Sequence, residues 1–125
     1  MVQLDPAHLV GTGGAIGALC RHLVSEYVDA DAFPLGTFTV NVVGSFVLGI
    51  VTFLDVTNTV VLFVGVGACG SFTTFSSFSF ETVRLWETGE RSWAITNAVG
   101  NLLGALVALG LAWLLVHVIA AYPRW

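Results

Sequence analysis

The chain has 125 residues, of which 56% are hydrophobic and only 10% are charged, and its mean hydropathy is +0.89. A soluble domain would carry about 25% charged residues, so the composition excludes an ordinary water-soluble fold. The net charge is −4 and the chain has no lysine, which excludes the basic surface that nucleic-acid binding requires.

The charged residues leave four long apolar segments. No Asp, Glu, Lys or Arg occurs in residues 32–54, 56–80 or 92–123, and each stretch exceeds the ~20 residues that cross a hydrocarbon core. A further apolar segment near the N-terminus carries charge only towards its far end. The chain begins without the basic residues of a cleaved signal peptide, so we expect this segment to be a span as well. We predict an all-α membrane protein with one four-span domain over residues 1–125, its helices at about 7–28, 35–54, 60–87 and 92–121.

The first segment combines small residues with one basic residue. Gly13 and Gly17 have the small-xxx-small spacing that lets helices approach closely in lipid. Arg21 follows one turn later. An ionisable side chain inside a span is commonly functional, whereas an arginine near a helix end can also extend to the interface, so two interpretations of Arg21 stay open.

The second segment carries a narrow stripe of polar or small residues, formed by Thr37, Asn41, Ser45 and Gly49 at four-residue spacing. One interpretation is a packing seam with interhelical hydrogen bonds. The other is a row of donors that faces a water-filled pathway. Because an unpartnered amide at membrane depth is costly, we expect Asn41 to face protein or water and not lipid.

The third segment is a poor continuous helix. Glycines at 65, 67 and 70 precede the β-branched Thr73 and Thr74, and both features lower helix propensity. We predict a helix break near Gly70–Thr74. Unwound backbone at membrane depth is tolerated only where it is buried in protein or lines a cavity, and broken membrane helices commonly bind ions.

The part of the third segment after the break alternates phenyl rings with hydroxyls. Helical spacing places side chains on two faces: Phe75 and Phe78 on one, and Thr74, Ser77 and Glu81 on another, with Ser76 and Ser79 adjacent. Hydroxyls and amides donate hydrogen bonds, and ring edges carry the positive part of the aromatic quadrupole, so these groups suit an anion. A cation pathway would show rings of acids, for which Glu81 is the one candidate.

The fourth segment adds Asn97 and Asn101, again four residues apart. With four spans, both termini and the link at Asp55 lie on one side of the membrane. Arg124 is the basic residue of that side, and Arg91 and Arg84 belong to the other. The basic-residue bias that sets topology is therefore weak and permits insertion in both directions, as an antiparallel dimer requires.

Three motifs, in this order, resemble the fluoride-specific ion channel family called Fluc or CrcB across essentially the whole chain. They are GGAIGALCR at residues 13–21, GTFTVNVVGSF at 36–46 and GSFTTFSSFSFE at 70–81. The resemblance implies an antiparallel, dual-topology homodimer in the cell membrane with two fluoride pores, each built from both subunits. It implies passive export of fluoride from the cytoplasm, which reduces fluoride toxicity. A heterodimer with a paralogue is the alternative assembly.

The resemblance also implies roles for individual residues. The fluoride pore would be lined by Phe75, Phe78, Asn41, Thr74, Ser76, Ser77, Ser79 and Glu81, with Arg21 near the vestibule. A structural Na⁺ at the dimer interface would be bound by the backbone carbonyls of Gly70 and Thr73. Ser77 departs from the threonine that is common in the family, and Asn97 and Asn101 stand where a tyrosine and a serine are frequent.

Two other classes of membrane protein remain as alternatives. A small four-span drug antiporter would need a membrane-embedded glutamate in the first segment, where Glu26 near the segment end is the only acid. A non-conducting membrane subunit would use its glycine and asparagine faces for packing alone. We expect no enzyme, because no nucleophile–base pair or metal-ligand spacing occurs in the sequence.

Overall fold

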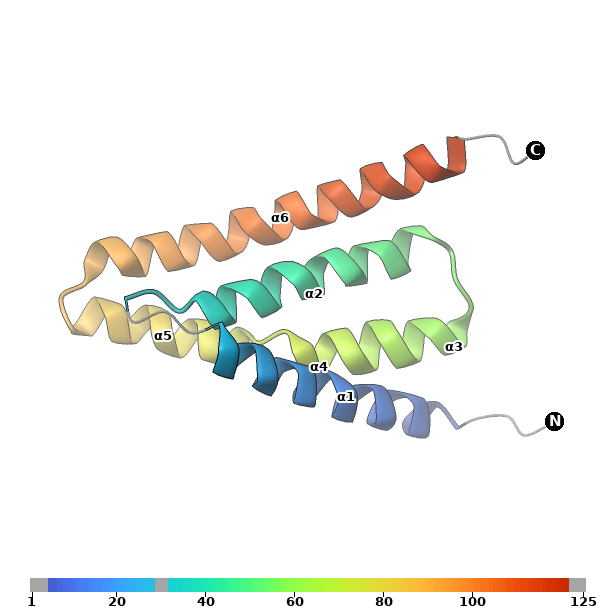
Figure 1. The fold of residues 1–125 in the computed structure, drawn as a ribbon, viewed down its shortest axis with the longest axis horizontal. Coiled ribbons are helices and arrows are strands. Elements are labelled where there is room, and N and C mark those ends of the chain that lie inside the picture. The colour runs from blue at the N-terminus through green and yellow to red at the C-terminus, as the bar shows by residue number, and fades with distance from the viewer. Residues whose placement is uncertain (1–4, 29–31, 122–125) are drawn as a thin grey trace.

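The computed structural model describes residues 5–28 and 32–121, and within these ranges the chain forms helices joined by short links, with no strand (Figure 1). The observed helix limits agree with the predicted segments within two residues. Arg124, which entered the predicted charge bias, lies outside the described residues. The elements, in chain order, are α1 (Pro6–Tyr27), α2 (Leu35–Phe53), α3 (Asn58–Val60), the π-helix η1 (Val61–Cys69), α4 (Gly70–Phe72), α5 (Phe75–Glu87) and α6 (Arg91–Ala121).

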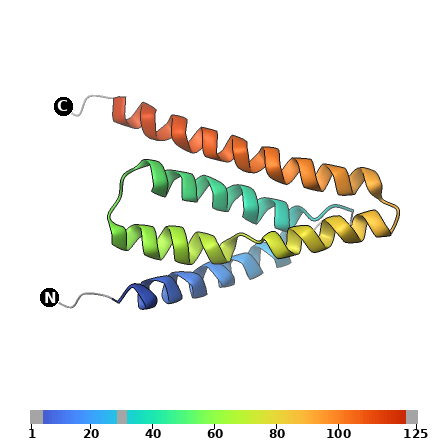
Figure 2. The ribbon, with the colours of Figure 1, turned by 180° about the vertical axis from the view of Figure 1, so that it is seen from behind.

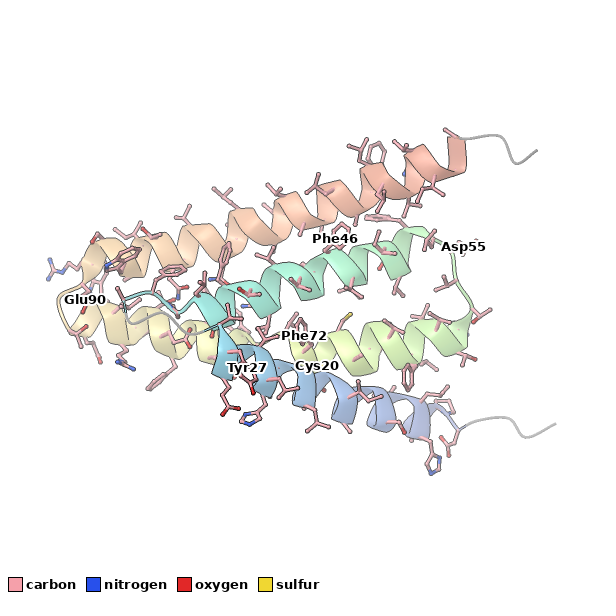
Figure 3. All side chains as sticks on the ribbon, viewed as in Figure 1. Cys20, Tyr27, Phe46, Asp55, Phe72 and Glu90 are labelled. Atoms are coloured by element: carbon pink, nitrogen blue, oxygen red, sulfur yellow. The ribbon has the colours of Figure 1, made fainter. Side chains whose placement is uncertain are left out.

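The elements from α3 to α5 follow one another along a single interrupted rod, beside which α1, α2 and α6 run lengthwise (Figures 1 and 2). The start of α1, the link from α2 to α3 and the end of α6 lie at one end of the molecule. Figure 3 shows Asp55 at this end and Glu90 at the other, with Phe72 near the middle. The arrangement agrees with the sides that the sequence assigns to the two links.

Three helical stretches within the described residues are long and apolar enough to cross a membrane: Leu35–Phe53, Asn58–Glu87 and Arg91–Ala121. The first predicted span is not among them. Its helix α1 has 22 residues, but Arg21, His22, Ser25 and Glu26 lower the hydropathy of its second half. Its first turn is well formed, because the Asp5 carboxylate accepts a hydrogen bond from Ala7 N at 2.9 Å and proline occupies the first helical position.

The distribution of polar and apolar side chains is inverted relative to a soluble protein. Most leucines and valines of α6 face outwards, and Leu102 and Val107 are 62% and 61% exposed. The buried polar or charged side chains of the described residues are instead Thr37, Thr74, Asn97 and Asn101. An apolar exterior around a polar interior is the arrangement that a lipid environment favours.

Glycines allow α1 to lie directly against η1. A β-carbon at Gly13 would overlap the carbonyl oxygen of Phe63, and one at Gly17 would overlap the carbonyl oxygen of Ala68. On the opposite surface, a β-carbon at Gly67 would come within 2.8 Å of the carbonyl oxygen of Val10. The close helix approach predicted from the Gly13–Gly17 spacing is confirmed, and it joins two backbones rather than two side-chain layers.

Candidate functional site

The helix break lies at Thr73 and Thr74, as predicted. Both residues have extended backbone angles, and α5 begins at the next residue. Thr74 caps α5, because its Oγ1 accepts a hydrogen bond from Ser77 N at 3.1 Å. The same oxygen lies 3.1 Å from Ser77 Oγ and 3.2 Å from Ser76 Oγ. Three hydroxyls predicted to line a pore are therefore gathered at the start of α5.

Asn41 of α2 binds the unwound peptide of Thr74 on both sides. Thr74 N donates to Asn41 Oδ1 at 2.8 Å, and Asn41 Nδ2 donates to the Thr74 carbonyl at 3.1 Å. Its second amide hydrogen is directed to Asn101 Oδ1 at 3.0 Å. The polar stripe of α2 thus faces protein at this level, and both amide hydrogens of Asn41 have protein acceptors within the chain.

The hydrogen bonds continue from Asn41 into α6 and return to α5. Asn101 Nδ2 donates to Asn97 O at 3.0 Å and to Asn97 Oδ1 at 2.9 Å. Asn97 Nδ2 donates to Thr82 Oγ1 at 2.9 Å, and Thr82 Oγ1 donates to the Phe78 carbonyl at 2.7 Å. We call Asn41, Asn101, Asn97 and Thr82 the amide chain. Sequence reasoning did not find Thr82, whose spacing from other polar residues carries no signal.

The break also leaves backbone carbonyls, among them those of Gly70 and Thr73, without the donors of a continuous helix. In a continuous helix Thr74 N would donate to the carbonyl of Gly70, and Ser77 N to that of Thr73. Both amides donate instead to side-chain oxygens, those of Asn41 and Thr74. Gly70 is exposed, with no atom within 4 Å of a β-carbon built on it. Neutral carbonyl oxygens are suitable ligands for a hard cation, so these residues fit the Na⁺ that the resemblance implies.

Phe75 and Phe78, predicted to line the pore, lie side by side on α5 and are called the filter below. Their ring centroids are 5.6 Å apart, and the rings are tilted by 49°. Phe75 is 79% exposed, whereas Phe78 is half-buried. Both rings therefore lie on the helix that the amide chain ties to α6, but the Phe75 ring is mostly exposed and contacts the ring of Phe78.

A cavity of about 590 Å³ opens at the end of the molecule near the α5–α6 link. The side chains that give it polar character are Ser25, Thr37, Ser77, Glu81, Arg84, Thr88 and Glu90. Thr37 Oγ1 donates to Glu81 Oε1 at 2.8 Å, which ties α2 to α5 inside this cavity. Ser77 and Glu81 share a helix face as predicted, and this face continues the hydroxyl cluster of Thr74 towards the outside.

Of the residues predicted to form the pore and vestibule, Ser77 and Glu81 line this cavity and the others do not. Arg21 is half-buried on α1 and is not among the residues lining it, and Ser79 is half-buried elsewhere on α5. The arginine at the cavity is Arg84, three residues after Glu81. Helical spacing from Glu81 was the signal that could have identified it. Glu26, the acid that a drug antiporter would require, is exposed at the end of α1 and lies 3.6 Å from His22.

The arrangement can stabilise a small anion along one line. Hydroxyl hydrogens, ring edges and a guanidinium all present positive charge. They extend from the break through Ser77 to the cavity at Arg84. Within residues 5–28 and 32–121, no group of three His, Cys, Asp or Glu side chains gathers as a metal site. The cavity lining also includes the carboxyl groups of Glu81 and Glu90, so hydrogen-bond donors and acceptors both occur there.

Comparison with known proteins identifies the family. The family model described as "CrcB-like protein, Camphor Resistance (CrcB)" matches residues 8–113. The fluoride-specific ion channel FluC 2 of Haloarcula marismortui is 62% identical over 119 residues, covering 95% of this chain and 100% of that protein. The fluoride-specific ion channel FluC 1 of Halobacterium salinarum is 50% identical over 111 residues, covering 89% and 93%. FluC 3 of Methanosarcina acetivorans, also named a fluoride-specific ion channel, is 42% identical over 107 residues, covering 85% and 96%. With this match and its long apolar helices, the chain belongs to the CrcB family and is a multi-pass membrane protein.

Proposed function

We propose that this protein is a passive, fluoride-selective ion channel. The observation that carries the proposal is the Phe75–Phe78 ring pair beside the hydroxyl cluster of Thr74, Ser76 and Ser77. These groups stand in a chain 62% identical to a relative named a fluoride-specific ion channel, which is a non-enzymatic role. Fluoride is small and strongly hydrated, so a pathway for it must replace water hydrogen bonds with protein donors that release the ion again.

The proposed direction of transport is out of the cytoplasm. Hydrogen fluoride is a weak acid that crosses membranes uncharged and dissociates at neutral pH. Fluoride therefore accumulates inside the cell, and a selective leak for the anion lowers its level without an energy source. The protein would in this way reduce fluoride toxicity.

The proposed membrane topology has four spans, which are α1 and the three long apolar stretches. The support for this is packing, because Gly13 and Gly17 hold α1 directly against η1, which belongs to a spanning stretch. The ends of the helices fit the same topology: α1 begins, and α6 ends, at the end of the molecule that holds Asp55 (Figures 1 and 3).

The proposed assembly is an antiparallel homodimer with two pores. A single chain leaves Phe75 79% exposed, and Phe80 on the same helix is 69% exposed. A second, inverted copy would cover Phe75 and place it in a pore that neither chain forms alone. The carbonyls of Gly70 and Thr73 from both copies would hold a structural Na⁺, whose charge draws the two breaks together.

Efflux from liposomes tests the proposed function. Vesicles reconstituted with the protein are loaded with potassium fluoride or potassium chloride, and the released anion is followed with ion-selective electrodes. We expect fluoride to leave only after valinomycin gives potassium a path, because a passive channel moves net charge. We expect chloride to stay near the level of protein-free vesicles. Equal release of both anions, or no release of fluoride, would overturn the proposal, and release without valinomycin would indicate coupled transport.

A further inference from the structure

The hydrogen bonds of the amide chain have a defined donor-to-acceptor direction, because two of its asparagines bind backbone groups. Thr74 N is only a donor, so Asn41 Oδ1 must face it and Asn41 Nδ2 must face the Thr74 carbonyl and Asn101. The Asn97 carbonyl is only an acceptor, so Asn101 Nδ2 must face it. Each asparagine therefore has one orientation, and each orientation requires that of its neighbour.

The burial of the amide chain argues against a role as ion ligands. Asn97 is 0% exposed and Asn101 is 6% exposed, and neither lines the cavity at Glu81 and Arg84. Both hydrogens of Asn101 Nδ2 are directed to Asn97. Asn101 consequently has no amide hydrogen left for an anion, and Asn97, which is fully buried, directs one amide hydrogen to Thr82 Oγ1.

We propose that Asn97 and Asn101 are positioning residues that hold the Asn41 amide against the unwound peptide of Thr74. Asn101 accepts from Asn41, Asn97 accepts from Asn101, and Thr82 anchors the series on α5 beyond the filter. The break is thus tied to α6 through Asn41 of α2, and the Phe75–Phe78 helix is tied to α6 directly through Asn97 and Thr82. The consequence for conduction rests on the proposed channel function, whereas the hold on Asn41 does not.

Hydrogen–deuterium exchange of the side-chain amides measures directly how strongly the Asn41 amide is held by its hydrogen bonds. The sequence contains four asparagines, three in the amide chain and Asn58 exposed outside it, so labelling with ¹⁵N-asparagine gives four side-chain signals. We expect the Asn41 amide of the wild-type protein in micelles to exchange with D₂O far more slowly than that of Asn58. An Asn41 amide that exchanges as fast as Asn58 would overturn the proposal without any variant.

Variants separate a positioning role from general packing. Asn101→Leu removes the acceptor of Asn41 Nδ2, and we expect exchange at Asn41 to accelerate about tenfold, the factor that corresponds to one ordinary hydrogen bond. Thr82→Val removes the far anchor, and we expect a smaller acceleration of about threefold, because the effect crosses two bonds. Thr82→Ser keeps the hydroxyl and should restore the wild-type rate.

Thr52→Val is the matched control, because Thr52 Oγ1 also donates to a carbonyl four residues back, that of Leu48, but lies outside the amide chain. It should leave Asn41 exchange and anion efflux unchanged. If Thr82→Val and Thr52→Val have the same effect on Asn41, the proposal fails. If Asn101→Leu does not fold, the Thr82 pair and the wild-type comparison with Asn58 still decide it.

Efflux assays then link the hold on Asn41 to conduction. We expect Asn101→Leu to lower fluoride efflux about tenfold and Thr82→Ser to preserve it. Wild-type protein that conducts no fluoride would refute the proposed function, while protection of Asn41 would still support the positioning role. Faster exchange at Asn41 with undiminished fluoride efflux would overturn the link between the two.

Discussion

At the residue scale, the two filter phenylalanines differ in what surrounds them. The backbone carbonyl of Phe78 accepts a hydrogen bond from Thr82 Oγ1. This bond joins Phe78 to the amide chain. Phe75 lies against Phe78 and is otherwise exposed. The position of Phe78 is therefore determined within one chain, whereas Phe75 needs a second chain to complete its surroundings.

Substitution of a filter phenylalanine by isoleucine removes the aromatic ring edge but keeps a large apolar side chain. We expect Phe75→Ile and Phe78→Ile each to reduce fluoride efflux to the level of protein-free liposomes, because isoleucine is apolar but has no aromatic quadrupole. Size-exclusion chromatography should show the same assembly as the wild-type protein. Phe80→Ile is the matched control on the same helix and should conduct normally. Full conduction by both filter variants would exclude the rings from the pathway.

At the scale of elements, two helix features depend on glycine and on unwound backbone. The α1–η1 contact brings Gly17 against the carbonyl of Ala68, where the wider turns of a π-helix present backbone to the neighbouring helix. The break between α4 and α5 is stabilised by Asn41, which accepts from Thr74 N in place of a helical carbonyl and also donates to the Thr74 carbonyl.

A single methyl group tests the α1–η1 contact. We expect Gly17→Ala to destabilise the fold by about 1–3 kcal/mol, because the added carbon would overlap the Ala68 carbonyl and the two backbones would have to separate. Gly11→Ala on the same helix meets no atom within 4 Å and should be neutral or stabilising by about 0.5–1 kcal/mol. Thermal unfolding in detergent, followed by circular dichroism, measures both. Equal melting temperatures for the two variants would contradict the contact.

Removal of sodium tests the role proposed for the break. We expect the melting temperature of the protein to fall when choline replaces Na⁺, because in the proposed dimer the carbonyls of Gly70 and Thr73 would then lose the charge that holds them together. Addition of Na⁺ should restore it. Potassium at the same ionic strength is the control for general salt effects. A melting temperature that is the same with each cation would count against a sodium site.

At the scale of the whole molecule, the charge distribution is compatible with two orientations. The described basic residues are Arg21, Arg84 and Arg91, and their small number leaves the topology bias weak. Exposed apolar side chains cover most of α6, so either orientation finds lipid around this helix. The proposed antiparallel pair could then form from a single gene product, and a paralogue would be needed only if one orientation dominated.

Added charge should separate the two orientations. We expect Glu87→Arg to bias insertion in one direction and Asn58→Arg in the other, since these exposed residues flank links at opposite ends of the molecule. C-terminal fusions to green fluorescent protein and to alkaline phosphatase report the orientation in cells. Each variant alone should lose fluoride efflux, and co-expression should restore it. Full efflux from a variant that inserts in one orientation would exclude the antiparallel dimer.

The sequence by itself determined the features that depend on local composition and periodicity. Charge-free segments predicted the helix limits, the run before Thr74 predicted the break, and glycine spacing predicted the close approach of α1. Each of these follows from the cost of charge in lipid, from helix propensity or from the room that a missing β-carbon leaves. None of them requires knowledge of which segments are neighbours.

The tertiary structure decided which polar groups meet. Asn41 binds Thr74 and Asn101, which are 33 and 60 positions away in the chain, and Arg84 rather than Arg21 lies at the cavity. A stripe of polar residues on one helix is compatible with a packing seam or with a water-filled pathway. Only the partners across the helix interface distinguish the two, because a donor that already has an acceptor in the protein is not available to an ion.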